Sequence, residues 1–154
     1  MVATRASDPT RHAARGPAIP PSERPFLVSM MRYFGIQHLR AERVDTPRSD
    51  IAVRLSRSGR EPPTLLIGRG WRRNRATNPR LARTQLVHEA LHVVGYPHSR
   101  PLRKAGFYAY DRRKDRVSRN VYRALAGGEP RFVPEQFGLE PPRQGMAQGA
   151  YRSG

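Results

Sequence analysis

The amino-acid sequence predicts an α+β fold, in which a small mixed or antiparallel sheet packs on a central helix. Two observations predict it. Apolar residues recur at helical spacing in three segments, and three short strand-like runs lie between the first and the second of them. A chain of 154 residues suits one domain. We expect a disordered tail over residues 1–20, the folded domain over 21–128 and a mostly irregular C-terminal tail over 129–154.

The first helix is expected to begin at Pro20-Pro21-Ser22, where Ser22 can cap it, and to end at Gly35. Its apolar positions are Phe26, Leu27, Met30, Met31 and Phe34. Strands are expected next, over residues 36–44, 50–55 and 64–67.

The second predicted helix begins at Asn78-Pro79, a capping side chain followed by proline at the first helical position. It runs to about Val94, and its apolar members are Leu81, Leu86, Val87 and Leu91. A third helix is expected from Asp115 to Ala126, because its apolar residues fall on one face before Gly127-Gly128.

The chain is strongly basic, with 29 Lys+Arg against 12 Asp+Glu and a net charge of +17. Such a charge is typical of proteins that contact nucleic acid. The alternative is codon supply in a GC-rich genome, because only Lys104 and Lys114 are lysines. Basic residues concentrate over 71–83 and 100–123. Non-specific nucleic-acid contact through this Arg-rich surface therefore stays open.

The absence of cysteine excludes a disulfide scaffold, a Cys-ligated zinc finger, an iron–sulfur site and a thiol nucleophile. No apolar run approaches 18 residues, so we expect no membrane span. The first 20 residues lack the apolar run of a secretory signal, and the expected location is cytoplasmic.

One segment carries most of the chemistry: H-E-A-L-H-V-V-G-Y-P-H, from His88 to His98. His88 and His92 are four residues apart on the second predicted helix, so both imidazoles project from one face and can bind one metal ion. Glu89 lies about 100° round the helix from His88. It can reach a water on that metal without being a ligand.

The third histidine completes a zinc site. Gly95 can take a positive φ and turn the chain back, and Tyr96-Pro97 then brings His98 in as a third ligand. Three histidines with an open fourth position describe a catalytic Zn²⁺ site rather than a closed structural one. The H-E-x-x-H-x-x-G-x-x-H pattern arises by chance in roughly two of 100,000 such sequences. A metal-free histidine cluster and a purely structural metal are the alternatives, and His12 and His38 receive no role.

These eleven residues resemble the extended zinc-binding pattern of the metzincin metallopeptidases. The resemblance implies a zinc metalloprotease that acts on polypeptide substrates, in which His88, His92 and His98 bind zinc and Glu89 is the general base. It also implies that the strand before the active-site helix, Leu65 to Gly68, binds the substrate in extended form. A methionine turn is expected beneath the zinc in that family, and the only downstream methionine here is Met146.

A second family is also similar, the YbeY-type endoribonucleases of ribosomal RNA maturation, which carry H-G-x-L-H-x-x-G-Y-D-H. The chain shares the three histidines, Leu91, Gly95 and Tyr96 with that pattern. It departs from it at Glu89 and Pro97. A third hypothesis is a non-catalytic, metal-stabilised module that binds nucleic acid.

In a peptidase mechanism Glu89 takes a proton from the attacking water and delivers it to the leaving amine. Tyr108 and Tyr110 are possible donors to the developing oxyanion, although ordinary packing is the simpler role for both. Asp111 and Asp115 can orient a ligand imidazole, and Asp115 can also cap the following helix.

Overall fold

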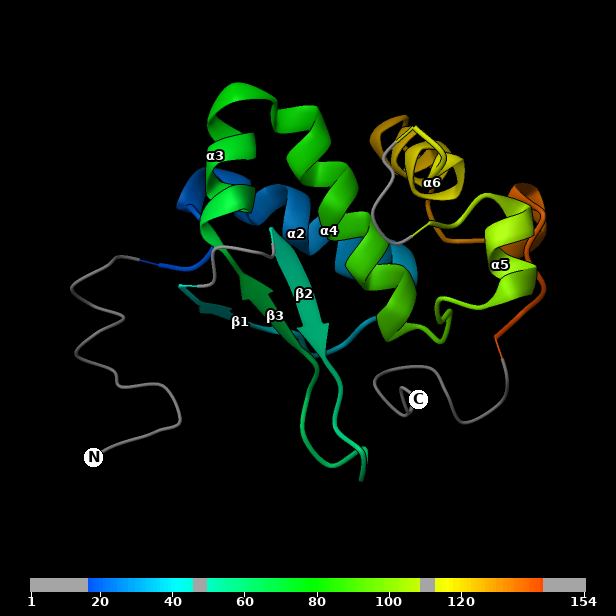
Figure 1. Cartoon of the computed structure of the whole chain (residues 1–154), viewed down its shortest axis with the longest axis horizontal. Helices are drawn as coiled ribbons and strands as arrows, with labels where there is room; N and C mark the ends of the chain where they lie inside the picture. Colours follow the sequence, from blue (N-terminus) through cyan, green and yellow to red (C-terminus); the bar gives the residue numbers. More distant parts are fainter. Residues whose placement is uncertain (1–16, 46–49, 109–112, 143–154) are drawn as a thin grey trace.

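A three-stranded sheet, five α-helices and two 3₁₀-helices make up the regular structure of the described residues (Figure 1). The computed structural model describes residues 17–45, 50–108 and 113–142. The α-helices are α2 (Arg24–Phe34), α3 (Arg69–Thr77), α4 (Pro79–Val93), α5 (Arg100–Ala105) and α6 (Arg116–Ala126). The strands are β1 (Arg40–Arg43), β2 (Ile51–Arg54) and β3 (Thr64–Ile67), and two 3₁₀-helices are η1 (Pro21–Glu23) and η2 (Pro134–Phe137). The predicted α+β class is confirmed.

The sheet is mixed, with the order β1-β3-β2. β3 pairs with β1 in parallel and with β2 in antiparallel register, so that Leu65 lies opposite Ala41 on one side and Val53 on the other. Of the three described strands, β3 is therefore the central one. It is also the most buried, because Leu65 and Ile67 are fully enclosed.

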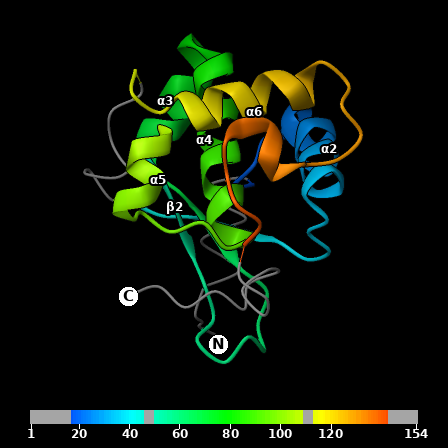
Figure 2. The same ribbon diagram turned by 90° about the vertical axis from the view of Figure 1, so that its right-hand side faces the viewer.

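The central helix α4 lies between the sheet and α6 (Figures 1 and 2). It begins as the sequence predicts: the Asn78 side chain accepts a hydrogen bond from the Leu81 N–H at 3.2 Å, and Pro79 is the first helical residue. From Leu86 to Val93 every residue is buried, because the helix has neighbours on several sides. Three of those buried residues are polar, namely His88, Glu89 and His92.

Two helices were not expected from the sequence. α3 is rich in arginine, and its buried Trp71 attaches it to α4 by donating a hydrogen bond from Nε1 to the Ala82 carbonyl at 2.9 Å. α5 is short; the Ser99 side chain caps its start and Gly106 ends it in a left-handed conformation. The capping role predicted for Ser22 is wrong. Ser22 lies inside η1, which has no side-chain cap, and its hydroxyl accepts a bond from Arg75.

The core includes side chains on both sides of the predicted domain limits 21–128. Ala18 and Ile19 are buried before it, and Leu139 is buried after it. The Tyr96 hydroxyl also donates a hydrogen bond to the Glu140 carbonyl at 2.5 Å. Residues 1–16 and 143–154 lie outside the described residues. No helix among the described residues is long and apolar enough to cross a membrane.

Candidate metal centre

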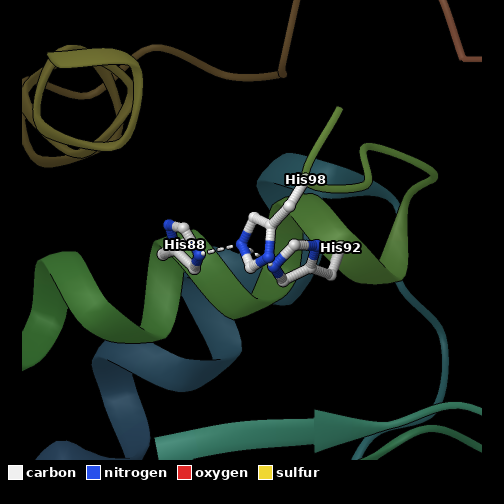
Figure 3. A group of neighbouring side chains, drawn as sticks. All are labelled: His88, His92 and His98. Carbon is white, nitrogen blue, oxygen red and sulfur yellow. Dashed lines mark hydrogen bonds between the residues drawn. The ribbon is translucent and has the colours of Figure 1, made fainter. Parts of the chain in front are cut away.

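The three histidines of the motif converge at the C-terminal end of α4 (Figure 3). The Nε2 atom of His98 lies 3.1 Å from Nε2 of His88 and 2.9 Å from Nε2 of His92. His88 and His92 come from one face of α4, as their spacing predicts, and both are buried, whereas His98 is exposed. The ligand atoms of all three lie within 4.8 Å of one another.

The turn after α4 brings His98 back over the helix. Gly95 adopts a φ of 112°, in the left-handed region that favours glycine. The Tyr96 N–H then donates to the Leu91 carbonyl at 3.0 Å, and Ser99 starts α5 directly after His98. The turn before His98 and the start of α5 after it therefore fix the position of His98.

The Nδ1 atoms of His88 and His92, which point away from the cluster, lie within hydrogen-bonding distance of other groups. His88 Nδ1 lies 2.7 Å from Asp115 Oδ2 and 3.2 Å from the Ser118 hydroxyl. His92 Nδ1 lies 2.7 Å from the Tyr96 carbonyl, which can only accept a hydrogen bond. Carboxylate and carbonyl acceptors place the proton of each neutral imidazole on Nδ1. Both Nε2 atoms then present lone pairs to the middle of the cluster.

This arrangement fits a bound cation. His98 Nε2 faces two lone pairs and carries at most one hydrogen, so hydrogen bonding alone leaves one of the close nitrogen pairs unsatisfied. A metal ion satisfies all three nitrogens at once. The residues present can therefore hold a metal.

Phe107 packs against all three histidine rings, a contact that the sequence did not predict. Its ring is stacked on His88 with centroids 4.5 Å apart, and it contacts His92 at 5.3 Å and His98 at 5.6 Å. The side chain is almost fully buried. Phe107 follows Gly106, and only the turn after α5 brings it under α4. No local pattern in the sequence indicates that contact.

Burial controls the electrostatics of the centre. It lowers the pKa of His92 to about 3 and also lowers the pKa of His98, with His88 adding to both shifts. Neutral imidazole is the form that binds a metal. Burial also raises the pKa of Glu89 to about 7, against the opposing effect of His88 and with a smaller raising effect of Asp115.

The other residues that the sequence singled out have different environments. Asp115 contacts His88 and also caps α6, since its Oδ1 accepts from the Ser118 N–H at 3.2 Å. Tyr108 is half-buried, with the Lys114 ammonium 5.7 Å from its ring centroid. His38 is exposed. His12, Tyr110, Asp111 and Met146 lie outside the described residues.

The expectation that the strand Leu65 to Gly68 binds substrate is wrong. Residues 64–67 form β3, which is paired on both sides. An extended peptide can add only to an edge strand, because a central strand has already used its backbone groups. Among the described strands, β1 and β2 lie at the edges, and β2 contacts α4.

No protein-family model, no curated protein and no solved structure matches this chain. A three-histidine set occurs in zinc enzymes of unrelated folds, so it does not by itself indicate a metzincin.

Proposed function

We propose that the protein is a zinc-dependent metallopeptidase that hydrolyses peptide bonds in polypeptide substrates. The observation that carries the proposal is the convergence of three Nε2 atoms beside a buried glutamate. His88, His92 and His98 supply the nitrogens, and Glu89 follows His88 on α4. A carboxyl group is costly to bury, and its presence next to a metal-binding cluster favours a chemical role.

The donor set favours zinc. Imidazole nitrogen is a common zinc ligand, and three protein ligands are the usual number in a catalytic zinc site, where a fourth position remains for water or substrate. The partners of His88 and His92 support this function, because acceptors on Nδ1 fix the tautomer that presents Nε2. Exposure of His98 leaves one side of the cluster accessible.

A zinc ion at this position would acidify a water molecule and polarise the carbonyl group of the scissile bond. Glu89 would accept a proton from the attacking water and deliver it to the leaving amine. Its pKa of about 7 without metal would fall when a dication is bound nearby, so that the carboxylate is ionised at neutral pH. Asp115 would hold the His88 imidazole and balance part of the positive charge.

A metzincin-like core is the fold that this proposal favours. It has the helix with the first two ligands, a glycine turn leading to the third ligand, and a mixed sheet that packs against the helix. An extended substrate would pair with β2, the edge strand that contacts α4. Phe107 would take the place beneath the zinc that a methionine occupies in that family.

The endoribonuclease remains the second candidate, and the exposed basic residues of α5 and α6 are the observation that favours it. Glu89 and Pro97 count against it, because the YbeY-type pattern has glycine and aspartate there. A non-catalytic metal module is the third. All three hypotheses include a metal, so the reaction has to be measured directly.

The test compares wild-type protein with Glu89→Gln on a casein substrate and on ribosomal RNA, in one zinc-loaded preparation of each. The variant should keep its zinc and its melting temperature, because Glu89 is not a ligand. Its peptide hydrolysis should fall by about 10²–10⁴-fold, the range for general acid–base catalysis. Glu129→Gln, an exposed acid changed in the same way, is the matched control and should behave as wild type.

His98→Ala separates the ligand from the base. It should lose zinc affinity and activity together, because it removes one of three ligands. Unaltered peptide hydrolysis in Glu89→Gln would overturn the peptidase mechanism. RNA cleavage that persists in that variant, without casein cleavage in the wild type, would support the endoribonuclease. Zinc without either activity would support the binding module.

A further inference from the structure

The exposed surface of α5, of the residues after it and of α6 is strongly basic. It carries eight exposed basic side chains among the described residues from 99 to 126: Arg100, Arg103, Lys104, Arg113, Lys114, Arg116, Arg119 and Arg123. We call these eight residues the α5–α6 basic surface. Asp115 is the only acid among the described residues of that stretch, and it is buried against His88. The next acid along the chain, Glu129, follows α6.

Helical spacing collects most of these charges into two stripes, because residues three or four apart lie on the same side of a helix. The stripes consist of Arg100, Arg103 and Lys104 on α5 and of Arg116, Arg119 and Arg123 on α6. The opposite side of α6 holds the buried Val117, Val121 and Leu125. The basic side of α6 therefore has to face solvent.

The two helices are joined where α6 begins. The Arg116 guanidinium donates to the Lys104 carbonyl at 3.4 Å, and the Val117 N–H donates to the Gly106 carbonyl at 3.2 Å. Gly106 has a φ of 105°, and a Cβ there would lie 2.5 Å from Cγ of Arg116, so this close approach requires glycine. These contacts bring the stripe on α5 and the stripe on α6 together in one surface.

This surface borders the candidate metal centre. α5 begins two residues after His98, and α6 begins one residue after Asp115, the partner of His88. Both helices lie on the same side of α4 (Figure 2). A molecule that lies across the starts of both helices is therefore close to His98, the exposed member of the cluster.

The second basic concentration in the chain, residues 71–83, is arranged differently. Arg75 and Arg83 form ion pairs with the buried Glu23 at 3.4 and 2.8 Å. Arg72 donates to the Ile67 carbonyl at 3.0 Å. Part of that charge thus stabilises the fold, whereas the eight residues of the α5–α6 basic surface stay exposed.

We propose that the α5–α6 basic surface binds the sugar–phosphate backbone of nucleic acid and holds it beside the metal centre. A codon bias explains why arginine replaces lysine, but it does not explain where the charges lie. The only two lysines of the chain, Lys104 and Lys114, are both on this surface. One guanidinium group can donate two parallel hydrogen bonds to a phosphate group. Contacts with the sugar–phosphate backbone carry no sequence preference. The proposal does not depend on which reaction the metal centre performs.

The test measures binding of fluorescently labelled 20-nucleotide single-stranded and duplex DNA to the full chain by anisotropy, between 50 and 200 mM KCl. One variant, Arg103→Gln with Lys104→Gln and Arg123→Gln, removes three charges from the surface. The control, Arg24→Gln with Arg73→Gln and Arg80→Gln, removes three exposed charges from α2, α3 and the start of α4. Each variant lowers the net charge by three. Zinc content and circular dichroism confirm that both are folded.

Wild-type binding should weaken steeply with salt and vary little with DNA sequence. The surface variant should bind more weakly at 100 mM KCl, with a slope of log affinity against log salt smaller by about two to three. The control should keep a slope within about one of the wild type. Equal losses in the two variants would overturn the assignment to this surface. Absence of binding at 50 mM KCl, or binding only to phosphatidylserine vesicles or to an acidic protein, would overturn the nucleic-acid partner.

Discussion

Residues that are not themselves candidate ligands orient the three imidazoles. Asp115 and the Tyr96 carbonyl each lie 2.7 Å from an Nδ1 atom, and Phe107 packs under the rings. The sequence suggested Asp115 because an acid near a ligand histidine is a common acceptor. It could not suggest Phe107 or the Tyr96 carbonyl, since any residue supplies a carbonyl and the ring reaches the site only through the turn at Gly106.

Asp115 has two tasks that substitution can separate. Asp115→Ala removes the partner of His88 and the cap of α6, so zinc affinity should fall about 10–100-fold and stability by about 0.5–2 kcal/mol. Asp115→Asn keeps a capping oxygen, and should lose zinc affinity with little loss of stability. Competition with a chromogenic chelator and thermal unfolding measure the two quantities. Wild-type zinc affinity in Asp115→Ala would contradict the role of this contact.

The stability of the metal-free protein should depend on pH through opposing groups at the metal centre. Burial lowers the pKa of His92 from 6.5 to about 3, so between these values the unfolded chain binds a proton that the folded chain does not, and stability falls as pH falls. Burial raises the pKa of Glu89 from 4.5 to about 7. In that window the folded chain keeps a proton that the unfolded chain releases, so this contribution grows as pH falls.

The effects of His92 and Glu89 oppose each other between pH 4.5 and 6.5, and the lowered pKa of His98 adds to the effect of His92. The metal-free wild type should therefore lose less stability there than a variant without Glu89. Glu89→Gln removes the opposing effect of Glu89, so its unfolding free energy should fall by about 1.4 kcal/mol more than that of the wild type for each pH unit between 6.5 and 4.5. Denaturant unfolding at pH 5, 6 and 7 in the presence of a chelator measures this. Parallel pH profiles for wild type and variant would show that Glu89 does not titrate as described.

At the scale of elements, prediction succeeded where a local signal was strong. The Asn78-Pro79 start fixed α4, and apolar spacing located β3 and α6. α3 was missed because Trp71 is its only buried residue, and the others gave a basic pattern without periodicity. The order of the strands could not be predicted, since it depends on long-range pairing. That is why the central strand was mistaken for a strand that can bind substrate.

Ion pairs of the buried Glu23 connect η1 to α3 and α4, and substitution can test them. Burial of Glu23 is compensated by Arg83, whose Nε lies 2.8 Å away, and by Arg75. These cations lower the pKa of Glu23, with the Arg83 hydrogen bond as the largest cause. Its stabilisation is thus complete above the unfolded value of 4.5 and is lost as pH falls through the lower folded value.

Glu23→Gln should therefore reduce the unfolding free energy at pH 7 by about 2 kcal/mol, the value for a charged hydrogen bond. The difference from wild type should shrink as pH falls below 4.5. Glu42→Gln, which loses an ion pair with the exposed Arg54, is the control and should cost under about 1 kcal/mol. A pH-independent loss in Glu23→Gln would contradict the charge-based explanation.

At the scale of the whole molecule, the core extends into the segment after α6. Leu139 is buried, Phe132 lies 5.0 Å from Phe34 and 6.1 Å from Tyr96 between ring centroids, and the Tyr96 hydroxyl donates to Glu140. The sequence predicted an irregular tail from residue 129, because proline and glycine are frequent there. Irregular backbone with a few large apolar side chains still contributes to a core, and composition does not reveal it.

A chain that ends at residue 128 should therefore be much less stable than one that ends at 142. Removing a buried aromatic side chain costs about 3–5 kcal/mol, and the segment supplies more than one large apolar residue. We expect a fall in melting temperature of at least about 10 °C. Zinc affinity should also fall, since Tyr96 holds His92. Equal melting temperatures for the two truncated chains would contradict this role of the segment.

The metal content of the full chain tests the three-histidine centre most directly. It is measured by inductively coupled plasma mass spectrometry after purification without a histidine tag and dialysis against zinc. The wild type should contain about one zinc per chain. The same value should hold for His38→Ala, the exposed control, and less than about a tenth of it for His88→Ala with His92→Ala. Full zinc retention in that double variant, or a wild type without zinc, would contradict the metal centre.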